Sequence, residues 1–103
     1  MSFVVRKHRL VEADQLFAAV WYDEQQPGLG DDFLDESERV ISSLTKNALL
    51  YSVRFDDVRC VRLRRFQPYG VFYVIRGSEV RLIAIHHGAR DEHWLRERRQ
   101  QLA

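Results

Sequence analysis

The first half of the chain repeats its apolar residues at the spacing of two helices. Over residues 11–25 they recur at steps of three and four, which is typical of one stripe of an amphipathic helix. Proline and glycine are costly inside a helix, so residues 26–30 end it. A second pattern of the same period covers residues 31–45, and the short connection predicts an antiparallel helical hairpin. The two predicted stripes are Ala13, Leu16, Phe17, Val20 and Trp21, then Phe33, Leu34, Ser37, Val40, Ile41 and Leu44.

The remaining segments favour strands and one further helix. Residues 3–6 form a short β-branched run that predicts a first strand. Val61 and Leu63 alternate with Arg62 and Arg64, which indicates a strand with one apolar and one basic face. The nearly continuous apolar run 69–75 predicts a central strand covered on both sides, and a tight turn at Gly77 leads into a third strand at 80–87. A short, highly charged helix is predicted over 91–102.

These elements predict an α+β fold in a single domain of residues 1–103. We expect an N-terminal strand, a helical hairpin on one face of a twisted antiparallel β-sheet, and a short C-terminal helix. The other sheet face is expected to stay available and to carry arginines. In the predicted core, Leu16, Phe17, Val20, Phe33, Val40, Ile41 and Leu44 pack against Val61, Leu63, Val71, Tyr73, Leu82 and Ala84.

Charge is unevenly distributed, although the net charge is only +1. Residues 1–50 carry a net charge of −4, whereas residues 51–103 carry +5, and all eleven cations of the second half are arginines. Arginine fits phosphate or carboxylate with two parallel hydrogen bonds, so the pattern suits nucleic acid, an acidic partner segment, or an ordinary charged surface.

Other features of the sequence bear on the cellular location of the protein and on its cofactors. The lone Cys60 cannot form an internal disulfide, and no apolar run reaches the length of a membrane span or a signal peptide. We therefore expect a cytoplasmic protein without membrane attachment. No sequence pattern typical of a metal, nucleotide or other cofactor site is present, so none is predicted.

Four residues are the candidates for chemistry or target contact: Arg62, Arg64, His87 and Arg90. Arg62 and Arg64 are expected to share a strand face, and Arg90 follows the third strand. Convergent arginines can hold a phosphate and stabilise transition-state charge. Neighbouring residues on a strand point to opposite faces, so one of His86 and His87 is expected to be packed and the other exposed.

Four groups of residues follow one another along residues 11–98. They are Glu12-Ala13-Asp14 with Leu16, Ala19 and Trp21-Tyr22; Pro27-Gly28-Leu29-Gly30 with Phe33-Leu34; Val58-Arg59 with Leu63, Phe66, Tyr69 and Tyr73; and Ala84-Ile85-His86-His87 with Arg90, Trp94 and Arg98. The order and spacing of these groups resemble the RelE/ParE superfamily of toxins, and its ParE branch in particular. The extra residue Gln67 departs from the ParE pattern.

The resemblance implies the toxin of a type II toxin–antitoxin module, of the kind that stabilises plasmids and inhibits growth. It implies a cognate antitoxin, a toxin–antitoxin hetero-oligomer, and DNA gyrase as the target of the ParE branch. The alternative is a RelE-type endoribonuclease that cuts mRNA on the ribosome, or a non-toxic member that only binds antitoxin. Arg90 matches a functional arginine of RelE-type toxins, and Arg62 and Arg64 roughly match two basic residues. A third functional arginine of RelE-type toxins corresponds to Gly70 in this chain, and the tyrosine in their C-terminal tail falls near Arg96. The lack of these two RelE-type residues favours a toxin that acts by binding.

Overall fold

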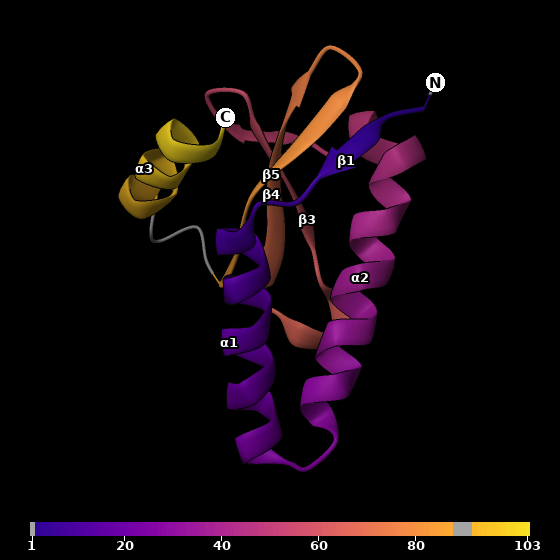
Figure 1. The fold of residues 1–103 in the computed structure, drawn as a ribbon, viewed down its shortest axis with the longest axis vertical. Coiled ribbons are helices and arrows are strands. Elements are labelled where there is room, and N and C mark those ends of the chain that lie inside the picture. Colours follow the sequence, from indigo (N-terminus) through magenta and orange to yellow (C-terminus); the bar gives the residue numbers. More distant parts are fainter. Residues whose placement is uncertain (1, 88–91) are drawn as a thin grey trace.

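The computed structural model describes residues 2–87 and 92–103 (Figure 1). The predicted succession of a strand, two helices, a strand region and a closing helix is confirmed. In chain order the elements are β1 (Val4–Arg6), α1 (Arg9–Gln25), α2 (Leu29–Asn47), the 3-10 turn η1 (Ala48–Leu50), β2 (Val53–Phe55), β3 (Val58–Arg62), the 3-10 turn η2 (Arg64–Phe66), β4 (Tyr69–Arg76), β5 (Glu79–His87) and α3 (Glu92–Leu102).

The sheet is mixed but mostly antiparallel. Its five strands lie in the order β1-β5-β4-β3-β2, and β1 runs parallel to β5. The predicted turn between β4 and β5 is confirmed, with Gly77 at a φ of 61°. The sequence patterns missed β2, because it has only three residues and a single buried side chain, Phe55, so no period of two can show.

The two sheet faces are covered by different helices. Val71 and Tyr73 of β4 pack into the core beneath α1 and α2, whereas Phe72 and Val74 face a second cluster that includes Leu95 of α3. The helical hairpin therefore lies on one face, as predicted. The expectation of a fully available second face is wrong, because α3 covers part of it. Ala84, which was expected beneath the hairpin, also belongs to the α3 side.

The orientation of α1 differs from the prediction. Leu16, Phe17 and Val20 were expected in the core, yet 50%, 76% and 60% of their surfaces are exposed. The buried face of α1 is instead Val11, Gln15, Ala18 and Ala19. A Cβ added to Gly30 would lie 2.4 Å from the Ala19 carbonyl oxygen, so the hairpin needs small residues where its helices meet. The large residues of α1 consequently face outward.

Polar contacts hold the hairpin together and tie it to the sheet. The buried Gln15 amide of α1 donates to Ser37 Oγ of α2 at 2.8 Å and to Glu38 at 3.0 Å, so its burial is compensated. The buried Tyr73 hydroxyl of β4 donates to the Ala48 carbonyl at 2.6 Å, and burial raises the pKa of Tyr73 to about 12. These contacts tie α1 to α2, and η1 to the central strand β4.

Candidate functional site

Two of the predicted site residues line one hollow, although not for the predicted reason. Arg62 is the last residue of β3, but Arg64 begins the 3-10 turn η2, so the two do not share a strand. The turn nevertheless leaves both arginines in the lining of the same depression between α2 and the end of β3. Arg90 lies outside the described residues.

This depression, the arginine hollow, is open to solvent and has a volume of about 700 Å³. Three elements supply its arginines: α2 gives Arg39, β3 gives Arg62, and η2 gives two more. Apolar side chains from α2 and β3 form part of its lining. The residues around it are Glu36, Arg39, Val40, Tyr51, Val61, Arg62, Arg64, Arg65 and Gln67. Arg39 could not be predicted as part of this hollow, because it belongs to a helix that is distant from β3 along the chain.

The arginines of the hollow differ in whether an acidic side chain pairs with them. Arg65 pairs with Asp32 at 3.3 Å, and its backbone N–H donates to the buried Glu36 carboxylate at 3.2 Å. Arg39, Arg62 and Arg64 are exposed and form no salt bridge with another described residue. Three cations that have no ion-pair partner among the described residues therefore line the hollow together with one carboxylate, that of Glu36, and this excess of positive charge favours an anionic ligand.

The hollow adjoins a sheet edge that is only partly used. β2 pairs with β3 at two positions, Arg59 and Val58. Residues 60–62 of β3 pair with β4 on one side, and no strand of the described chain pairs with them on the other. Unpaired backbone groups along such an edge are available to an added strand.

Gly70, where RelE-type toxins carry an arginine, is closely surrounded in this structure. It is buried and pairs with Arg62 across β3 and β4. A Cβ added there would lie 2.6 Å from Cys60 Sγ and 3.3 Å from the Val61 carbonyl oxygen. Burial raises the pKa of the Cys60 thiol, so it stays neutral and occupies this space as a small apolar group. A basic side chain at position 70 would require this packing to change.

The adjacent histidines occupy the end of β5, away from the arginine hollow. His86 is half-buried and stacks on Trp94 of α3 with ring centroids 4.4 Å apart, whereas His87 is exposed and lies 5.4 Å from the Tyr69 ring. The packed and the exposed histidine of the prediction are thus His86 and His87 respectively. Their rings still stack on each other at 4.9 Å. His87 does not line the arginine hollow, so the four candidates do not form one described cluster.

His87 instead lines a second depression beside the exposed face of α1. This aromatic hollow has a volume of about 580 Å³ and is formed by Phe17, Trp21, Tyr22, Gln67, Pro68, Tyr69 and His87. Phe17 and Trp21 continue into the exposed Leu16 and Val20, so an apolar stripe runs along α1. Contiguous exposed apolar surface of this kind marks interaction sites. Gln67 lines both hollows.

A buried ion pair fixes α3 against α1 and β5. Arg98 donates to both carboxylate oxygens of Asp14, at 2.9 and 3.0 Å, and the two side chains are only 10% and 14% exposed. Asp14 also accepts the N–H of Ile85 at 3.1 Å, and the Arg98 guanidinium lies 4.5 Å from the centre of the Trp94 ring. Asp14, Trp94 and Arg98 of the toxin-like motifs are therefore structural neighbours.

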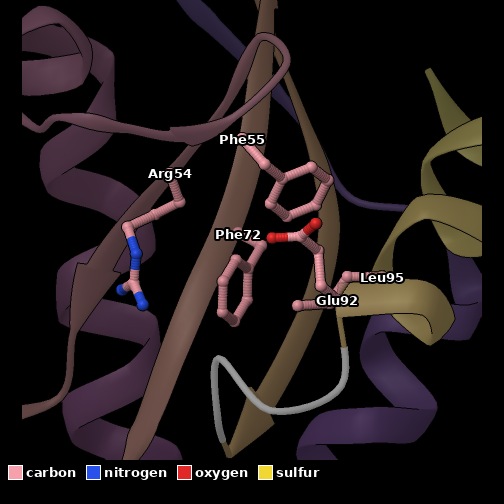
Figure 2. A pocket seen from close by; sticks show the side chains of 5 residues that line it. All are labelled: Arg54, Phe55, Phe72, Glu92 and Leu95. Carbon is pink, nitrogen blue, oxygen red and sulfur yellow. The ribbon is translucent and has the colours of Figure 1, made fainter.

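A smaller cavity lies on the α3 side of the sheet. Figure 2 shows the rings of Phe55 and Phe72 beside Leu95, with Glu92 between them and Arg54 to one side. Its volume is about 80 Å³, enough for only a few water molecules. It suits packing between β2, β4 and α3 better than the binding of a substrate. None of the described helices is both long and apolar enough to cross a membrane.

Comparisons with known proteins support the fold. A solved structure of the chromosomal ParDE TA system from P. aeruginosa contains a chain that is 17% identical and superposes with a TM-score of 0.73. The match covers 84% of this chain and 96% of that one. No family model matches the sequence, and no curated protein matches it. The chain thus shares its fold with a chain of that ParDE structure, which confirms the α+β architecture expected from the resemblance.

Proposed function

We propose that the protein is the toxin of a type II toxin–antitoxin module and acts in the cytoplasm by binding an essential target. The observation that carries this proposal is the apolar stripe of α1 on a ParE-like fold. Phe17 alone exposes 76% of its surface, and a stable complex would remove it from water. The structural neighbour belongs to a toxin–antitoxin system, so an antitoxin is the partner that best suits this surface.

We expect an amphipathic helix of the antitoxin to lie against α1. Leu16, Phe17, Val20 and Trp21 recur at helical spacing on the outer side of α1, and the aromatic hollow beside them accepts a bulky side chain. The complex should bury more than ~1,000 Å² to be stable. Co-expression of the chain with the product of the neighbouring gene, followed by affinity purification, tests whether this complex forms. Recovery of the chain alone, together with normal growth when it is expressed alone, would contradict the proposal.

DNA gyrase is the proposed target, on the resemblance to the ParE branch. The close packing of Gly70 against Cys60 supports a binding toxin, because it leaves no room for the arginine of RelE-type toxins. The second candidate is a ribosome-dependent mRNA endoribonuclease, favoured by the exposed arginines of the arginine hollow. A supercoiling assay and a ribosome-dependent cleavage assay separate the two. Inhibition of supercoiling without mRNA cleavage is the expected result.

Arg90 stays a candidate target contact on its sequence position alone. For a binding toxin, Arg90→Ala should reduce target affinity and keep antitoxin binding. For a nuclease, it should remove ~2–4 kcal/mol of transition-state stabilisation. A growth-arrest assay on a variant shown to melt normally provides the measurement. Unchanged toxicity would exclude a functional role for Arg90.

A further inference from the structure

Three aliphatic side chains are exposed on the short segment that joins α2 to β2. Leu49, Leu50 and Val53 expose 58%, 73% and 47% of their surfaces, and we call these three residues the aliphatic patch. They line neither the arginine hollow nor the aromatic hollow. Exposed aliphatic side chains that lie close together mark a surface that another partner covers.

The segment is anchored on both sides of its two leucines. The carbonyl of the buried Ala48 accepts a hydrogen bond from the Tyr73 hydroxyl at 2.6 Å. The Tyr51 carbonyl accepts one from Arg59 Nη1, also at 2.6 Å. Because the backbone is held at these two points, the exposure of the leucines follows from the fold itself.

Positive charge accompanies the aliphatic patch. Residues 39–55 contain no Asp or Glu. Lys46 is exposed in the last turn of α2, and Arg39 lies two turns earlier, on the same side of that helix. Arg59 pairs with Val53 across β3 and β2, so their side chains share a sheet face. None of the three cations forms a salt bridge with another described residue.

Aliphatic side chains flanked by cations fit the surface of an anionic membrane better than they fit other partners. A bilayer offers the leucines an apolar interior directly beneath negative headgroups. A single-stranded nucleic acid needs aromatic side chains for its bases to stack on, and the aliphatic patch has none. A second copy of the chain, packed patch against patch, would bring the Lys46 side chains of both copies together, and like charges oppose such a contact.

We propose that the aliphatic patch is a peripheral contact site for an anionic lipid bilayer. Its three side chains enter the boundary between headgroups and acyl chains, while Arg39, Lys46 and Arg59 lie among the lipid phosphates. Such a contact is reversible and needs no spanning segment. It differs from the sequence-based expectation of a chain without membrane attachment, because that expectation considered only spanning segments and signal peptides. The site does not depend on whether the protein is toxic.

Co-sedimentation of the full purified chain with lipid vesicles tests the proposal. Vesicles made of equal amounts of phosphatidylcholine and phosphatidylglycerol are compared with vesicles of phosphatidylcholine alone. The chain should bind the anionic vesicles, and this binding should weaken as salt is added. Binding to the neutral vesicles should be at least about tenfold weaker, because they offer the cations no net negative charge.

Matched variants locate the contact. Leu50→Ser removes the most exposed side chain of the aliphatic patch and should weaken binding to anionic vesicles about fivefold or more, whereas Leu16→Ser, which removes an exposed leucine of α1, should leave it unchanged. Lys46→Gln should weaken binding about fivefold, whereas Arg9→Gln, at the start of α1, should not weaken it. Circular dichroism checks that all four variants fold.

Several results would overturn the proposal. They are no binding to either kind of vesicle, equal binding to both kinds, and equal binding by Leu50→Ser and Leu16→Ser. A dimer in sedimentation equilibrium that Leu50→Ser abolishes would overturn it too, because the aliphatic patch would then hold a second copy. Tighter binding of a single-stranded oligonucleotide than of anionic vesicles, weakened by Leu50→Ser, would indicate a nucleic-acid site instead.

The result stands apart from the proposed function. A chain that arrests growth but does not bind vesicles would retain the toxin assignment and lose the membrane contact. A chain that binds anionic vesicles without affecting growth would do the reverse.

Discussion

The contact between Gly70 and Cys60 leads to a quantitative prediction. Atoms in van der Waals contact lie about 3.5–4.0 Å apart, so a Cβ at position 70, only 2.6 Å from Cys60 Sγ, would overlap the sulfur strongly. Overpacking of this kind costs ~1–3 kcal/mol in a well-packed interior. We therefore expect Gly70→Ala to lower the free energy of unfolding by that amount.

A double-mutant cycle tests the stated cause. Cys60→Ala removes the sulfur, and because Cys60 is only half-buried it should cost about 1 kcal/mol or less by itself. In the Cys60→Ala background, Gly70→Ala should become cheaper by at least ~1 kcal/mol, since only the 3.3 Å contact to the Val61 carbonyl remains tight. Urea denaturation of the four proteins gives these free energies. An equal cost of Gly70→Ala in both backgrounds would refute the reasoning, as would a cost near zero in the parent chain.

Three further variants test other parts of the account. Arg98→Gln leaves the buried Asp14 carboxylate without its cation, so thermal melting should show a loss of ~3–5 kcal/mol. Asp57→Asn breaks contacts to Arg99 and Arg76, whose hydrogen bonds, that of Arg99 above all, lower the pKa of Asp57. Because the carboxyl is 41% exposed, the loss of stability at neutral pH should be only ~0.5–1 kcal/mol. A carboxyl whose pKa is lowered by folding stabilises the fold only above the usual carboxyl pKa. In urea titrations, the stability difference between the parent chain and Asp57→Asn should therefore shrink as the pH falls below about 4. A difference that stays constant with pH would contradict this role of Asp57. Phe17→Ser should leave stability nearly unchanged but weaken antitoxin binding by at least about tenfold in calorimetry, and equal affinity would exclude the stripe from the interface.

The sequence predicted the elements of the fold better than the faces they bury. Helical spacing placed α1 and α2 to within about two residues at each end, since caps and breakers are local. It could not show that Ala18 and Ala19 are buried while Phe17 and Val20 are exposed, because that choice depends on the close approach of another helix, which meets Ala19 at Gly30. Periodicity identified two apolar stripes on one helix without distinguishing the inner from the outer.

The candidate site was predicted only in part, for a similar reason. Arg62 and Arg64 do line one hollow, but through a 3-10 turn that an alternating pattern cannot distinguish from a strand. Arg39 lines the same hollow from α2, and the edge of β3 is half open because β2 is short. Both features depend on how distant segments pack, so local sequence patterns could not predict them. His87, predicted with the arginines, belongs to the aromatic hollow beside α1.

Growth arrest and its relief test the central claim most directly. The chain is expressed from an inducible promoter, alone and together with the product of its neighbouring gene, and colony counts are followed after induction. The account predicts arrest by the chain alone and recovery with the neighbouring protein, and Phe17→Ser should arrest growth but no longer be rescued. Normal growth with the chain alone, at a level where the folded protein is detected, would contradict its assignment as a toxin.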